Sequence, residues 1–179
     1  KRERLIEAAT NLIHRQGFHR TTLADIAEES DVPLGNVYYY FKTKEDICNA
    51  VIEQRVDSIK EVFDVCCKCK DPKLVLREFV KSIAKESETI AEHGCAIGSL
   101  CQELDKMPSE LSVPANMCIK KLIHWTGEQF KAMNCKSVDN LATELVARIQ
   151  GVLLIGHALH DPKLIKKQLR SINLWIDTL

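Results

Sequence analysis

The sequence predicts an all-α fold, and three observations support this prediction. Only seven glycines and five prolines occur in 179 residues, so few residues interrupt helices. Apolar residues recur at intervals of three and four along most of the chain, which is the period of an amphipathic helix. Helix-capping residues stand in front of several of these apolar patterns. We therefore expect about nine consecutive helices and no strand, rather than a turn-rich sandwich or barrel.

The first three predicted helices are short and close together in the sequence. The first carries apolar residues at spacings of three and four within residues 5–13, and it stops at Gly17. The second begins at a capping box formed by Thr22 and Asp25. A third helix is expected over about residues 34–41.

A turn at residues 31–33 separates the second and third helices, because Pro33 cannot continue a helix. Two such helices form a helix-turn-helix, whose second helix can lie in the major groove of DNA. The third helix carries tyrosine hydroxyls and the amide of Asn36, which can contact phosphates and base edges. Lys44 lies in the first turn of the next helix, beside backbone N–H groups that favour a phosphate. These residues predict a DNA-binding surface.

The rest of the chain predicts longer helices. Thr43 opens one that ends near Cys67, and Asp71-Pro72 opens another that ends near His93. A short helix is expected over residues 97–104.

Three further helices are expected after residue 104. Pro108 and Pro114 bracket the start of one, and Ser137 caps the next, which is apolar up to Leu159. Asp161-Pro162 then starts the last helix.

Composition excludes several classes of protein. Lys plus Arg and Asp plus Glu each number 25, so the formal net charge is zero and a protein that coats nucleic acid by bulk charge is excluded. Hydrophobic residues make up 45% and charged residues 28%, as in a soluble globular protein. The longest uncharged run, 149–160, is too short to cross a bilayer, and no signal peptide opens the chain, so we expect a cytoplasmic protein without membrane contact. The first residue is Lys1, so we expect some residues to precede it.

An all-α enzyme is the rival hypothesis, and the sequence argues against it. No Ser/His/Asp set, paired catalytic carboxylates, Gly-rich phosphate loop or metal-ligand motif occurs. We therefore expect neither catalysis nor a cofactor.

The N-terminal segments resemble a known family. Gly17-Phe-His-Arg-Thr-Thr-Leu-Ala-Asp-Ile-Ala27 and Val32-Pro-Leu-Gly-Asn-Val-Tyr-Tyr-Tyr-Phe-Lys-Thr-Lys-Glu45 are similar to the DNA-binding domain of TetR-type (TetR/AcrR) transcriptional regulators. The resemblance implies a repressor with a helix-turn-helix domain at 1–46 and a ligand-binding and dimerisation domain at 47–179. It further implies a homodimer on a palindromic operator in double-stranded DNA, released by a small-molecule inducer.

The resemblance also implies roles for individual residues of the N-terminal domain. Phe41, Ile26 and Val37 match its core, and Asp31 departs from the small residue, such as Gly, that the family usually has there. The domain is nearly neutral, since residues 1–44 hold seven basic and six acidic side chains. The positions that match DNA contacts are Thr22, Leu34, Gly35, Asn36, Tyr38, Tyr39, Tyr40 and Lys44.

A pocket in a helix bundle is mostly apolar with a few polar anchors. Segment 94–104 resembles one that links pocket and DNA-binding domain in a branch of the family, although an ordinary helix corner or core would explain it equally. The candidate pocket residues are Phe79, Ile83, Cys95, Ile97, Leu100, Cys101, Met117, Trp125 and Gln150.

Eight cysteines offer an alternative signal for the same scaffold. Without a secretion signal we expect all eight to be reduced. Cys95 follows a glycine at a predicted helix start, where the helix dipole favours thiolate, and Cys66, Cys67 and Cys69 form a cluster with no second ligand group at zinc-finger spacing. The alternative hypothesis is therefore a repressor that responds to thiol oxidation or to a metal. The simpler interpretation is that the cysteines are inert and bind no metal.

The last two helices are apolar on more than one face, which exceeds what one core requires. The family pairs these helices between subunits. The residues predicted at the dimer interface are Leu145, Ile149, Val152, Leu153, Gly156, Leu169, Ile172, Trp175 and Ile176.

Overall fold

A computed structural model describes residues 1–106 and 110–179. Its regular structure there is entirely helical, which confirms the predicted fold class. The chain divides into two compact units, the first formed by residues 1–57 and 96–118 and the second by 58–95 and 119–179. The expected boundary at residue 46 remains a prediction, and this division groups a later helix with the N-terminal ones.

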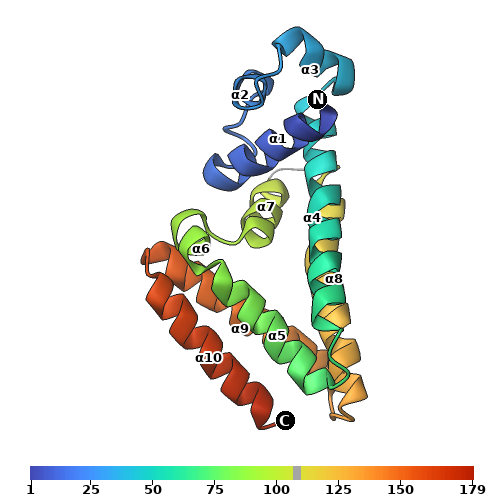
Figure 1. Ribbon diagram of the computed structural model, residues 1–179, viewed down its shortest axis with the longest axis vertical. Coiled ribbons are helices and arrows are strands. Elements are labelled where there is room, and N and C mark those ends of the chain that lie inside the picture. Colours follow the sequence, from blue (N-terminus) through green and yellow to red (C-terminus); the bar gives the residue numbers. More distant parts are fainter. Residues whose placement is uncertain (107–109) are drawn as a thin grey trace. The chain divides into compact units, whose positions relative to one another are not determined.

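The first unit contains the predicted helix-turn-helix. Figure 1 shows its first three helices in blue, at the start of the chain. Its helices are α1 (Arg2–Gln16), α2 (Leu23–Glu29), α3 (Leu34–Tyr40), the first part of α4 (Lys44–Cys66), α7 (Ala96–Asp105) and the first residues of α8 (Ser112–Ala132).

The core of the first unit is built from apolar side chains at helical spacing. α1 packs against α2 and α7, and α2 packs against α3. Ile26 and Val37 are completely buried and Phe41 nearly so, which confirms the three core positions expected in this domain.

The predicted helix ends in this unit are confirmed by their hydrogen bonds. α1 ends at Gly17, whose φ of 88° suits glycine. Thr22 and Asp25 form a reciprocal capping box at the start of α2. Asp46 N donates to Thr43 Oγ1 and Thr43 N to Asp46 Oδ2, which caps α4 in the same way.

The second unit is a bundle in which α10 packs along α5, α9 and α6 (Figure 1). Asp71 and Asp161 cap α5 and α10 ahead of a proline, as predicted. The helices are α5 (Pro72–Lys85), α6 (Ser87–His93), α9 (Val138–Ala158), α10 (Pro162–Asp177) and the remaining parts of α4 and α8.

Two expectations about helix boundaries in the second unit were wrong. The single helix expected from Asp71 to His93 is two, because Glu86 has φ −90° and ψ 9°, outside the α-helical region; no Gly or Pro marks the break. Ser137 precedes α9 but does not cap it with its side chain, because its φ of 56° is left-handed and capping requires an extended residue. Pro114 lies in the first turn of α8, and Pro108 falls outside the described residues.

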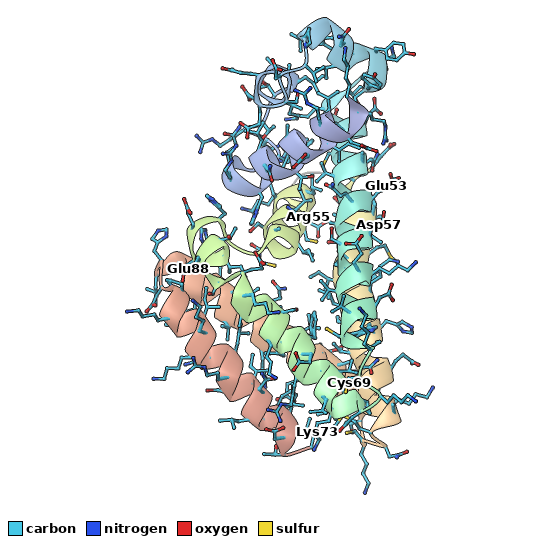
Figure 2. All side chains as sticks on the ribbon, in the orientation of Figure 1. Glu53, Arg55, Asp57, Cys69, Lys73 and Glu88 are labelled. Atoms are coloured by element: carbon cyan, nitrogen blue, oxygen red, sulfur yellow. The ribbon has the colours of Figure 1, made fainter. Side chains whose placement is uncertain are left out.

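Exposed ion pairs join α10 to its neighbours. Lys166 lies 2.9 Å from Glu88, which Figure 2 labels on α6, and Arg77 lies 2.9 Å from Asp177. Such pairs contribute little in water. Apolar packing between α9 and α10 is close at Gly156. A Cβ placed on this glycine would lie 2.1 Å from Cγ1 of the buried Ile165.

We predict opposite effects of alanine at two glycines of α9. Gly156→Ala should destabilise the fold by about 1–3 kcal/mol, because the new methyl group must displace Ile165. Gly151→Ala is the matched control, because no atom lies within 4 Å of its Cβ position, and it should stabilise the helix by about 0.5–1 kcal/mol. Urea unfolding measures both, and equal effects would contradict the packing assigned to Gly156.

Candidate nucleic-acid interface

The turn between α2 and α3 sets the direction of the recognition helix. Asp31 N donates to Glu28 O at 3.1 Å, and Val32 N donates to Ala27 O at 3.0 Å. With Asp31 at φ 51°, these two bonds form a Schellman motif, in which a left-handed residue ends a helix. A glycine would adopt this φ without strain, and aspartate is among the few other residues that tolerate it.

Arg4 of α1 stabilises this turn from outside. Its guanidinium donates to the carbonyl oxygen of Ser30 and, at 3.3 Å, to that of Asp31. The carbonyl of Ser30, the C-cap of α2, is one that the end of a helix leaves without an intrahelical partner. No local pattern of residues links Arg4 to a turn 26 residues away, so this role could not be predicted from the sequence.

The outward face of α3 is uncharged and exposed. Tyr39 exposes 78% of its surface, Tyr38 48% and Leu34 40%, and no atom lies within 4 Å of a Cβ placed on Gly35. Val37, on the opposite face, is completely buried. A seven-residue helix with four exposed large side chains, Tyr40 included, presents a surface that a partner can cover.

Two further residues of α3 lie at the edges of this face. Tyr40 is 36% exposed and its ring packs edge-on against that of Tyr39, with 5.0 Å between centroids. Asn36 is half-buried, and its backbone N–H donates to Pro33 O at 2.7 Å. Its side-chain amide remains available for contact.

Thr22 is exposed at the start of α2. Its hydroxyl oxygen accepts a hydrogen bond from Asp25 N at 3.1 Å, which leaves the hydroxyl proton available to a phosphate oxygen. It therefore lies at a helix N-terminus, where an anion is favoured.

Lys44 is held against the loop between α1 and α2. Its ammonium donates to Phe18 O at 3.0 Å and to His19 O at 3.3 Å, and it lies 4.3 Å from the centroid of the Phe18 ring. These bonds use two of its three N–H donors. The phosphate contact stays a prediction, with one donor available for it.

α3 itself carries no acidic side chain. Asp25, Glu28 and Glu29 line an open cleft of about 670 Å³, together with Leu12, Gln16 and Arg20 of α1 and the following loop. A nearly neutral domain can therefore present a recognition helix without carboxylates to repel phosphates.

Comparisons with known proteins agree with this geometry. Residues 5–51, from α1 into α4, match the family described as bacterial regulatory proteins, tetR family. An uncharacterized HTH-type transcriptional regulator from the lacX 3′ region of Lactococcus lactis is 27% identical, covering 89% of this chain and 85% of its own. The HTH-type transcriptional regulator LmrA of Bacillus subtilis is 25% identical, covering 87% of this chain and 85% of its own.

The chain carries the DNA-binding domain of TetR-type transcriptional regulators. The fold agrees, since a TetR transcriptional regulator from Legionella pneumophila superposes with a TM-score of 0.86 at 22% identity, covering 98% of this chain and 95% of that one. A TetR regulatory protein from Rhodobacter sphaeroides gives a TM-score of 0.85, also at 22% identity, over 96% of each chain. These proteins are regulators and not enzymes, which confirms the expectation that the chain is not an enzyme.

The candidate pocket residues are divided between the two units, so their assembly into one pocket stays a prediction. Phe79, Ile83, Cys95, Trp125 and Gln150 belong to the second unit. Ile97, Leu100, Cys101 and Met117 belong to the first, where Leu100 and Cys101 are buried and Met117 is 40% exposed.

An aromatic cluster forms within the second unit. The rings of Phe63 and Trp125 stack in parallel with 4.0 Å between centroids, and Phe79 packs edge-on against both, at 6.0 Å and 5.3 Å. The partnership of three aromatic rings from α4, α5 and α8 depends on the tertiary structure.

Most residues predicted at the dimer interface pack inside one protomer. Leu145, Ile149, Leu153, Gly156, Leu169, Ile172 and Ile176 are buried there, while Val152 and Trp175 are half-buried. Gly156 accommodates Ile165 of the same chain. The exposed large apolar side chains of these helices and the turn between them are Leu154, Ile155, Leu159 and Leu174.

The thiols differ in burial. Burial, reinforced by the nearby carboxylates of Glu103 and Glu45, raises the pKa of Cys48 to about 12. Burial also raises the pKa of Cys66, whereas Cys67 is exposed and Cys69 and Cys95 are half-buried. In the parts of the chain that the structure describes, no three His, Cys, Asp or Glu residues gather as metal ligands.

We predict that Cys48 resists alkylation in the folded protein, while Cys67 reacts readily. The thiolate is the reactive form, and a pKa raised from 9.0 to about 12 leaves Cys48 protonated at neutral pH. By the same shift, the stabilisation associated with Cys48 is complete below pH 9.0 and is lost as the pH rises towards about 12. Iodoacetamide labelling with peptide mass mapping measures both thiols, and equal labelling rates would refute the assignment.

Proposed function

We propose that the chain is a homodimeric TetR-type repressor that binds a palindromic operator through α3 and is released by a small-molecule inducer. The exposed, acid-free face of α3, oriented by the turn at Asp31, is the single observation that carries the proposal. Two-fold symmetry would place the two copies of α3 about one DNA turn, roughly 34–36 Å, apart or at a multiple of it.

The proposed contacts divide into two classes. Leu34, Gly35, Asn36 and Tyr39 face the bases, where they would determine sequence preference. The hydroxyls of Thr22, Tyr38 and Tyr40 and the ammonium of Lys44 contact phosphates or the groove edge, where they position the protein without specifying sequence. Support comes from the exposure of the three tyrosines and Thr22.

We predict that the double variant Tyr38→Phe/Tyr40→Phe binds operator and non-operator DNA about tenfold more weakly than the wild type. The substitutions remove two hydroxyl donors and keep both rings, and each lost hydrogen bond is worth about 0.5–1.5 kcal/mol. Asn36→Ala should instead change the preferred sequence. Fluorescence anisotropy with duplexes selected from a random library measures both effects. Unchanged affinity of the double variant, with a normal unfolding transition, would overturn the assignment.

The proposed dimer uses the second unit. α9 is long and apolar enough to cross a membrane by length and composition alone, a property that core helices of soluble proteins share. On α9 and in the turn that follows, Ile155 and Leu159 lie four residues apart and expose 52% and 62% of their surfaces. Association of two copies would remove such side chains from water, which is the driving force for an obligate interface.

We predict that Ile155→Glu/Leu159→Glu is a monomer in light scattering at micromolar concentration, while the wild type is a dimer. The two carboxylates would be buried without partners at the interface. Val113→Glu is the matched control, because Val113 on α8 is 70% exposed and apolar but lies outside the proposed interface, so this variant should remain a dimer. Leu153 is a poor choice for this test, because it is 3% exposed and its replacement would disturb the protomer. A dimeric double variant would contradict the interface.

The proposed inducer binds more tightly to one of two arrangements of the ligand-binding domain and shifts the population towards it. The cluster of Phe63, Phe79 and Trp125 offers flat aromatic faces that suit a planar apolar ligand. A coupling of about 1–3 kcal/mol would loosen operator binding roughly 5–150-fold, and operator would weaken inducer binding by the same factor. A thiol-based signal at Cys95 or Cys67 is the alternative, since Cys67 is exposed and Cys95 half-buried.

A further inference from the structure

We infer that Glu103 of α7 is a positioning residue for DNA binding, because its carboxylate holds the loop that sets the start of α2. Oε2 accepts a hydrogen bond from Phe18 N at 2.8 Å, and Oε1 accepts one from His19 N at 2.7 Å. Both oxygens of one charged group therefore bind consecutive backbone amides, and such charge-assisted bonds are about twice as strong as neutral ones. Glu103 lies outside the matched residues 5–51 and outside the proposed DNA contacts.

Gly17 is shaped to receive this carboxylate. A Cβ at Gly17 would lie 2.9 Å from Oε2 and 3.0 Å from Oε1 of Glu103, closer than real side chains approach. Its φ of 88° is also one that other residues rarely adopt. The glycine thus both ends α1 and leaves room for a side chain that comes 86 positions later in the sequence.

The same two loop residues are held from a second side by Lys44. The amides of Phe18 and His19 donate to the carboxylate of Glu103 of α7. The carbonyl oxygens of the same two residues accept hydrogen bonds from the ammonium of Lys44 at the start of α4. The buried Thr21 adds a bond from its hydroxyl to Gly17 O at 2.7 Å. We call this set of contacts around Phe18 and His19 the loop clamp.

The loop clamp controls where α2 begins. Thr22, the capping residue of α2, directly follows Thr21, and α2 leads through the turn at Asp31 into α3. A loop without its carboxylate would let α2 and α3 sample several orientations relative to α1. Specific affinity falls with the fraction of molecules in the competent orientation. Non-specific affinity depends mainly on total charge and is affected much less.

Electrostatics alone predicts the opposite result for a loss of Glu103. Removing a carboxylate from a DNA-binding unit reduces repulsion of phosphates and strengthens binding to every sequence. The loop clamp predicts weaker specific binding from the same change. The sign of the effect therefore separates a positioning role from a role in charge balance.

The test compares Glu103→Gln with the wild type on a duplex that the wild type selects from a random library, and on a scrambled duplex. Glutamine keeps the size but can accept only one of the two amide bonds and loses the charge. We expect specific affinity to fall roughly tenfold or more while affinity for the scrambled duplex stays equal or rises. Glu110→Gln is the control, because Glu110 is exposed in the same unit and loses the same charge; its specific affinity should stay equal or rise.

A second variant and a wild-type measurement guard against simple unfolding. Glu103→Asp keeps the charge but is one methylene shorter, so it should also lose specific affinity. In the wild type, hydrogen exchange at the amides of Phe18 and His19 should be slow, and in the glutamine variant it should accelerate there while the α5 and α10 amides stay protected. Unchanged or tighter specific binding by a folded Glu103→Gln, parallel losses on both duplexes, or unprotected wild-type amides at Phe18 and His19 would each overturn the inference.

Discussion

The left-handed turn at Asp31 is the constraint on which the DNA-binding unit depends. A helix must end with several carbonyls unpaired, and here the Schellman bonds of Asp31 and Val32, with the guanidinium of Arg4, satisfy them in one place. Because α3 has only seven residues, it has little stability of its own and takes its direction from this turn and from the burial of Val37. The turn at Asp31 and the buried Val37 together leave the tyrosines of α3 exposed on its outer face.

A recognition helix can serve a protein with no net charge if its acids are kept elsewhere. The chain has equal numbers of acidic and basic residues, yet α3 carries no charged side chain. Several carboxylates are used internally: Asp25 and Asp46 cap helices, and Glu103 binds the loop amides. Carboxylates held by backbone N–H groups are already partly neutralised, which lowers their cost near phosphates.

The bundle of the second unit separates two uses of apolar surface on α9 and α10. One stripe, which includes Leu145, Leu169 and Ile176, is consumed by the protomer's own core. The close contact of Gly156 with Ile165 belongs to this packing. The second stripe, which includes Ile155 and is continued by Leu159 in the turn after α9, remains exposed and is the part left for a second copy.

The sequence by itself determined the helices and the helix-turn-helix, because these depend on local chemistry. Capping boxes at Thr22 and Thr43, the proline starts of α5 and α10, and the period of the apolar residues act within a few positions of the chain. The family resemblance, rather than a local pattern, placed Val37 in the core, and Val37 is completely buried.

Only the tertiary structure decided which distant groups meet. Three contacts join parts of the chain that are far apart in the sequence. Arg4 binds the turn at Asp31, 26 positions away, and Glu103 binds the amides of Phe18 and His19, up to 85 positions away. Phe63 of α4 stacks on Trp125 of α8. Periodicity identifies an apolar stripe but not its partner, so it could not show that most residues predicted at the subunit interface are buried within one protomer. The helix break at Glu86 and the left-handed conformation of Ser137 could not be predicted from the sequence either. Neither position has a Gly or Pro that would signal an unusual backbone conformation.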